Sequence, residues 1–216
     1  MKKRHQGVSL IELMIALVIM AILLTAAAPG FATWVRNSKI RASAEAVRDG
    51  LQLARGEAVR RNASVRFQLT SSLDGDCTLN AEGAYGPANW VVSADSPAGA
   101  CGADPVGEDA ALAEAAAPRI LQKRPADEGS RAILARSSQE AVTFTGLGRV
   151  STATSATTAI TLRPGDDQGC ERSRCLCVTV SVGGQVRLCD PKLTKSADPQ
   201  ACFDRQGAGA VVTCSL

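Results

Sequence analysis

The chain has very few of the side chains that enzymes use most often for proton transfer at neutral pH. Its 216 residues include one histidine, His5, and one tyrosine. A Ser-His-Asp or Cys-His arrangement would therefore have to use His5. The stretches GPANW (86–90) and GLGRV (146–150) lack the lysine and the spacing of a phosphate-binding P-loop. We therefore expect a protein that is not an enzyme and that holds no cofactor.

A long apolar run near the N-terminus is the first feature that is present. Residues 8–28 contain only three polar side chains, which are Ser9, Glu12 and Thr25. About 20 apolar residues in a helix span the hydrocarbon core of a bilayer. The basic cluster Lys2–Arg4 precedes the run, and the positive-inside rule keeps such an end in the cytoplasm. The pattern predicts a single membrane-spanning helix, in which the charge of Glu12 is costly.

The competing interpretation is a cleaved secretory signal peptide. Leu13–Leu24 has the length of an apolar h-region, and Ala26–Ala28 offers an A-x-A cleavage site. Two observations count against this interpretation. Pro29 would follow the cleavage site directly, and Glu12 would interrupt the apolar region without a reason. We therefore favour a helix that stays attached to the protein.

The stretch GVSLIELMIALVIMAILLTAAAPGF (7–31) resembles the class III leader junction of type IV prepilins and type II secretion pseudopilins. The resemblance implies that prepilin peptidase cleaves after Gly7, that residues 1–7 are a leader, and that Val8 becomes N-methylated. It also implies that Glu12 pairs with the N-terminal amine of a neighbouring subunit, and that Pro29 kinks or locally melts the helix. The simpler alternative is a Glu12 side chain that reaches the cytoplasmic face of the membrane. His5 would be lost with the leader.

An amphipathic helix is expected to follow over residues 29–62, after a transmembrane half at 8–28. Apolar residues recur there at helical spacing: Ile40, Ala44, Val47, Leu51, Ala54 and Ala58. The segment LQLARGEAVRRNASVRF (51–67) resembles the helix-to-strand segment of the GspH/FimT family of minor pilins and pseudopilins. Residues 142–162 and 178–191 resemble two later strand segments of that family. The implied fold is α+β and pilin-like, with a long N-terminal helix packed on a mainly antiparallel β-sheet domain at 63–216.

Alternating apolar residues predict the strands of that domain. SVRFQL (64–69) alternates, as do the pairs Val142–Phe144 and Ile160–Leu162. VTVSVGGQVRL (178–188) predicts a hairpin with a turn at Gly183–Gly184. Residues 93–130 are rich in Ala, Pro, Gly and Asp, which indicates a loop-rich insertion, with a short helix near Glu108–Ala116.

Eight cysteines, all beyond the apolar run, indicate disulfides formed in an oxidising periplasm. The hairpin places Cys177 and Cys189 on one face, where they could face one another. Two further pairings are hypotheses. Cys77 with Cys101 would close the first loop excursion, and Cys202 with Cys214 would close the C-terminal tail. The roles of Cys170 and Cys175 are left open. Zinc at CERSRCLC (170–177) is the less favoured alternative because C-x-x-C spacing is missing and the mature chain has no histidine, so we expect no metal.

These features predict a minor pilin of a type IV pilus that helps to initiate assembly at or near the filament tip, with roles in adhesion, twitching or DNA uptake left open. The alternative is a minor pseudopilin of a type II secretion system. Expected partners are other minor and major pilins, prepilin peptidase and the inner membrane. The protein would cross that membrane once, with a cytoplasmic N-terminus and a periplasm-facing domain, and would reach the cell surface in the pilus.

Weak DNA binding is the least supported expectation. Some pilus members of the family bind DNA through a G-R-x-R motif, but Gly184–Arg187 reads GQVR and lacks the first arginine. Arg187, Lys192 and Lys195 could still contact phosphates without sequence preference. Solvated tail charges are the simpler interpretation.

Overall fold

The computed structural model describes residues 9–107, 111–112, 114–126, 133–151, 157–166, 169–171, 173–193, 195, 197–202 and 214. At residues 26–29 it describes the helical backbone only. The chain divides into two units, Met1–Arg36 and Asn37–Leu216.

Helix α1 (Leu10–Arg61) contains 52 residues and begins and ends at recognisable caps. At its start, the Glu12 N–H donates to Ser9 Oγ at 3.4 Å, which matches the Ser-x-x-Glu pattern of a capped helix N-terminus. At its end, Asn62 has a φ of +46°, and the Ala63 N–H donates to the Ala58 carbonyl at 3.1 Å. Asparagine tolerates this left-handed conformation better than most residues, so it can end the helix there.

Among the described residues, no single helix meets the length and apolarity needed to cross a membrane. The parts Leu10–Thr25 and Gly30–Arg61, bent by 44° at the break between them, meet the requirement together by length and composition.

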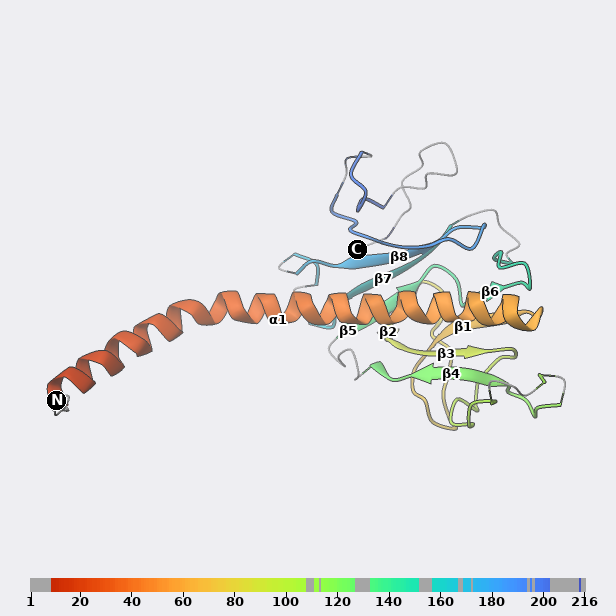
Figure 1. Ribbon diagram of the computed structural model, residues 1–216, viewed down its shortest axis with the longest axis horizontal. Helices are drawn as coiled ribbons and strands as arrows, with labels where there is room; N and C mark the ends of the chain where they lie inside the picture. Colours follow the sequence, from red (N-terminus) through yellow and green to blue (C-terminus); the bar gives the residue numbers. More distant parts are fainter. Residues whose placement is uncertain are drawn as a thin grey trace, which may run out of the picture. The chain divides into compact units, whose positions relative to one another are not determined.

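Two antiparallel sheets make up the remainder of the described secondary structure, as Figure 1 shows. The first sheet has the strand order β4-β3-β1-β6, and the second has the order β2-β5-β7-β8-β9. The strands are β1 (Val65–Thr70), β2 (Gly86–Pro87), β3 (Asn89–Ser93), β4 (Ile120–Arg124), β5 (Ile133–Ser137), β6 (Ala141–Phe144), β7 (Thr158–Pro164), β8 (Leu176–Val180) and β9 (Val186–Cys189). The predicted α+β class, with a long N-terminal helix followed by antiparallel sheets, is confirmed.

The core of the second unit joins the helix to both sheets. The predicted apolar stripe of α1 is fully buried, from Ile40 to Ala58, together with Phe67 of β1, Ile160 of β7 and Val178 of β8. Gly50 shows how close the helix lies to the first sheet. A Cβ atom at this position would come within 2.9 Å of the Phe67 ring and 3.0 Å of the Trp90 ring. Because even one methyl group would overlap these rings, glycine is required here for packing.

The predicted strands are present in β1, β6, β7 and the β8–β9 hairpin. Three longer strands were not predicted, namely β3, β4 and β5, and β4 lies inside the stretch expected to be a loop. The short helix expected near Glu108–Ala116 is absent at residues 111–112 and 114–116, and the rest of that stretch lies outside the described residues.

Candidate functional site

The first turns of α1 expose apolar side chains on every face. All twelve large apolar residues between Leu10 and Leu24 are at least 53% exposed. A helix that is apolar all round is normally buried in a protein or in a membrane. This segment is therefore a surface that needs to be covered by lipid or by other protein chains.

Glu12 is the one charged side chain among the residues of this exposed apolar surface. It lies in the first turn of α1 and is itself exposed. A carboxylate is favoured at a helix N-terminus because the backbone N–H groups there carry partial positive charge. The expected processing residues Gly7 and Val8 lie outside the described residues. Pro29 lies in the stretch where the helix bends, and its side chain is not described.

The predicted hairpin has the expected register. Val180 lies opposite Val186, and Cys177 lies opposite Cys189. Gly184 in its turn has a φ of +80°, which glycine adopts without strain. A Cβ atom on Gly184 would lie 1.9 Å from the Gly148 carbonyl oxygen, to which Arg55 Nε also donates at 3.1 Å. The hairpin turn, the 145–149 turn and the helix therefore meet at one point, where a side chain at residue 184 has no space.

Two of the three candidate DNA-contacting residues already donate hydrogen bonds to backbone carbonyls. Arg187 Nη2 donates to the Pro199 carbonyl at 3.1 Å. Lys192 Nζ donates to the carbonyls of Cys170 and, at 3.3 Å, Ser173. Lys195 is exposed. The structure thus gives Arg187 and Lys192 roles in holding neighbouring loops.

All eight cysteines form disulfides, which are Cys77–Cys101, Cys170–Cys175, Cys177–Cys214 and Cys189–Cys202. The expected Cys77–Cys101 pairing is present. The expected Cys202–Cys214 pairing is wrong. Cys202 lies beside the end of β9, because the Asp190 N–H donates to the Gln200 carbonyl at 2.7 Å, and it bonds to Cys189.

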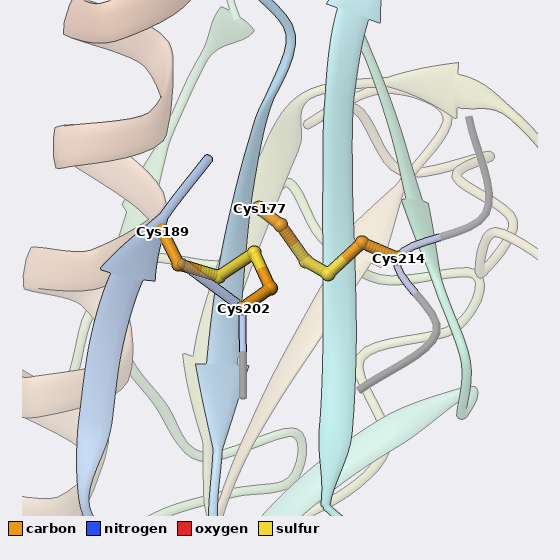
Figure 2. Close-up of side chains that lie close together, drawn as sticks. All are labelled: Cys177, Cys189, Cys202 and Cys214. Carbon is orange, nitrogen blue, oxygen red and sulfur yellow. A yellow bond between two sulfur atoms is a disulfide. The ribbon is translucent and has the colours of Figure 1, made fainter. Parts of the chain in front are cut away.

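Cys177 and Cys189 do face one another across the hairpin, as expected, but each bonds to a tail cysteine instead of to the other. Figure 2 shows these two disulfides side by side. Chain order gave no signal for this pairing, because the path of the tail is set by contacts with β9. The disulfide between Cys170 and Cys175, whose roles had been left open, closes a short loop before β8.

An ion pair between the exposed side chain of Arg174 and the buried side chain of Asp190 joins that loop to the end of β9. Arg174 Nε donates to Asp190 Oδ2 at 2.6 Å, and the Asp190 side chain is 5% exposed. The Arg174 N–H donates to Asn37 Oδ1 at 2.9 Å, which ties the loop to α1. The disulfide loop, the helix and the tail are therefore connected through a few polar contacts.

The loop-rich insertion is anchored by charge as well as by a disulfide. Arg119 donates to both carboxylate oxygens of Asp95 at 2.6 Å. These hydrogen bonds lower the pKa of Asp95 below its usual range, and partial burial opposes them. Lys123 Nζ donates to the carbonyls of three consecutive residues, Cys101 to Ala103, at 3.0–3.1 Å. The insertion therefore follows a defined path near its disulfide.

Comparisons with known proteins give two matches to family models. Residues 43–184 match the family described as type II transport protein GspH. Residues 2–28 match the prokaryotic N-terminal methylation motif. A search of curated protein sequences found no match.

Among solved structures, the chain is similar to the type IV minor pilin FimU of Pseudomonas aeruginosa in two crystal forms. In the P21 form the identity is 18%, with 69% of this chain and 87% of that chain covered and a TM-score of 0.42. In the P65 form the identity is 16%, with 68% and 90% covered and a TM-score of 0.41.

The GspH match covers about two thirds of the chain, and the methylation motif precedes it. The chain belongs to the GspH family, and the expected membership of the GspH/FimT family is confirmed. Its class is that of pilus and pseudopilus subunits, which are structural proteins.

Proposed function

We propose that this protein is a minor pilin of a type IV pilus that helps to initiate assembly and sits at or near the filament tip. The observation that carries the proposal is the exposed apolar segment Leu10–Leu24, with Glu12 in its first turn, which lies inside the matched methylation motif at residues 2–28. Such a segment can be held in the membrane before assembly and can be covered by neighbouring helices afterwards.

Removal of the leader generates the positive charge with which the Glu12 carboxylate can pair. Prepilin peptidase cleaves after Gly7, and the new N-terminal amine on Val8 is methylated and stays positively charged. In a filament this amine lies near Glu12 of an adjacent subunit. A charge within an apolar environment is tolerated when it is paired, so the pair selects the correct offset between neighbouring helices.

The topology follows from the same segment. Before assembly, α1 spans the inner membrane once with its N-terminus in the cytoplasm, because basic residues precede the apolar run. The disulfide-linked domain faces the periplasm, where thiols are oxidised. After assembly the protein is carried to the cell surface in the pilus, in contact with major and other minor pilins.

A minor pseudopilin of a type II secretion system is the second candidate. The observation in its favour is that the matching family model is described as a type II transport protein. Four disulfides and a cysteine-containing tail after β9 favour the pilus, because a subunit exposed at the cell surface gains from covalent cross-links.

The test is to find the protein in its assembled form and to read its N-terminus. We expect sheared surface pili to contain the protein, with Val8 as its methylated first residue by mass spectrometry. Deletion should reduce piliation and leave protein secretion unchanged. A secretion defect with normal piliation would favour the second candidate, and a mature N-terminus at or beyond Pro29 would overturn both.

A further inference from the structure

Four of the eight sulfur atoms form one compact buried group. The Sγ atoms of Cys177, Cys189, Cys202 and Cys214 all lie within 4.8 Å of one another. Their residues are between 0% and 8% exposed and form a separate apolar cluster with Ala159. Figure 2 shows the four side chains brought together from β8, β9 and the C-terminal tail. We call these four cysteines the sulfur quartet.

The dimensions of the quartet match a tetrahedral metal site. A zinc ion bound by four thiolates at about 2.3 Å keeps its sulfur atoms about 3.8 Å apart. The existing spacing therefore requires shifts of no more than about 1 Å between sulfurs of different disulfides, and the two bonded pairs have to open. Two ligand positions are already fixed by the sheet, since Cys177 and Cys189 are direct partners in the register of β8 and β9.

The chemistry of the surroundings also suits a zinc-thiolate centre. Soft thiolate ligands in a tetrahedral arrangement select zinc over hard cations such as calcium and magnesium. The four cysteines are buried together with Ala159, and burial limits the access of water to zinc–sulfur bonds.

We propose that the reduced form of this chain binds one Zn²⁺ at the sulfur quartet, as an alternative to the Cys177–Cys214 and Cys189–Cys202 disulfides. Two molecules of a dithiol reductant supply the four electrons and four protons that convert both disulfides to thiols, and are themselves oxidised to disulfides. Zn²⁺ then replaces the four thiol protons, which pass to solvent. The bound metal holds the tail against β8 and β9 until two molecules of a disulfide oxidant accept the four electrons. The oxidants take up four protons from solvent and become dithiols, both disulfides of the chain form again, and Zn²⁺ is released.

The experiment uses the full chain in detergent, reduced with a phosphine under anaerobic conditions and titrated with Co²⁺ and then Zn²⁺. We expect one Co²⁺ per chain, with the absorption of a tetrahedral tetrathiolate, displaced by one Zn²⁺. The double variant Cys202→Ser/Cys214→Ser should lose this site. The matched control Cys170→Ser/Cys175→Ser removes the same number of thiols and should keep it.

A second experiment, cysteine alkylation of the chain without substitutions, gives a result that does not depend on whether a variant folds. Alkylation of the reduced chain with and without zinc, followed by peptide mass spectrometry, should show that zinc slows the reaction of the four quartet cysteines and leaves the reaction of the other four unchanged. Zinc-dependent protection at Cys77, Cys101, Cys170 or Cys175 instead, or no zinc binding by the reduced chain, would overturn the proposal. Equal zinc binding by the oxidised chain would overturn it as well, because it would place the metal at other ligands.

Discussion

The two units of the chain differ in the exposure of their apolar side chains. In the first unit, the apolar residues from Leu10 to Leu24 are exposed, and Trp34 is 65% exposed. In the second, the helix stripe from Ile40 to Ala58 is fully buried, and Trp90 is 4% exposed. The same helix thus begins as a surface for external partners and continues as part of a core. The difference implies that assembly and stability can be changed separately.

Glu12→Ala should produce the largest effect, and it should act on assembly alone. In the proposed filament contact, the change leaves the amine of the neighbouring subunit without its partner, and breaking a buried ion pair costs about 3–5 kcal/mol. We therefore expect more than 100-fold less protein in sheared filaments, measured by quantitative blotting, with processing unchanged.

The matched control is Glu45→Ala, which breaks an exposed pair with Arg41 on the same helix. Its effect should be below about 1 kcal/mol. Equal filament incorporation of the Glu12 variant and the wild type would refute the pairing.

Removal of disulfides should act on the second unit alone, with losses that follow loop length. The separations are 37 residues for Cys177–Cys214, 24 for Cys77–Cys101, 13 for Cys189–Cys202 and 5 for Cys170–Cys175. Entropy of the unfolded chain predicts losses from about 4 kcal/mol for the longest loop to about 2 kcal/mol for the shortest.

Urea unfolding followed by Trp90 fluorescence, in a Trp34→Phe background, measures these losses without a signal from the first unit. Thiol titration finding eight free cysteines in the periplasmic protein would remove the basis for the ranking.

Sequence patterns predicted the parts of this fold that have a strong local period. The helix stripe recurs at 3.6 residues, and the β8–β9 hairpin has alternating valines around a glycine turn, so both were found. Strand β4 was missed for a physical reason. It has one fully buried residue, Ile120, followed by the partly buried Leu121 and three polar residues, and it lies at the edge of its sheet. Such an edge strand depends on its neighbours more than on its own pattern.

As with the fold, the sequence predicted the parts of the candidate site that have a local signal and missed those that depend on distant residues. The leader motif indicates Glu12 as a candidate residue without any structure, because the signal of the motif is local. The sulfur quartet was not found, since four cysteines allow three pairings and only the path of the tail beside β9 decides between them. The contact between Gly184 and Gly148 was missed too, because 36 residues separate the two turns.

Gly184→Ala tests that contact and should destabilise the second unit by about 3 kcal/mol. The added methyl group overlaps the Gly148 carbonyl, and the φ of +80° is strained for alanine. The matched control is Gly56→Ala, where no atom lies within 4 Å of the new Cβ on a helix. It should stabilise by about 0.5–1 kcal/mol. Urea midpoints that move equally in both variants would contradict the steric argument.

The Asp95–Arg119 pair should make a smaller, pH-dependent contribution to stability. Hydrogen bonds from Arg119 lower the pKa of Asp95 in the folded state. The contribution is therefore fully present above the unfolded pKa of about 4, and is lost as pH falls through the lower folded value. Asp95→Asn should flatten the stability profile of the second unit in this acid range and leave it unchanged in shape near pH 7. An identical acid profile in the variant and the wild type would show that the pair does not contribute.

DNA binding should show the smallest effect, because two of the three candidate cationic side chains already donate hydrogen bonds within the protein. If Arg187, Lys192 and Lys195 all met phosphates, the logarithm of affinity would fall against the logarithm of salt concentration with a slope of about −3. Arg187 and Lys192 donate to backbone carbonyls, so we expect a slope nearer −1, with no preference for sequence. Fluorescence anisotropy at several salt concentrations measures this slope.

Lys195→Gln should abolish this weak binding. Lys192→Gln should instead shift the unfolding midpoint, because the ammonium group of Lys192 holds the Cys170–Cys175 loop. A slope near −3 that Lys192→Gln reduces would show that the loop contact is released on binding, and would restore the three-cation site.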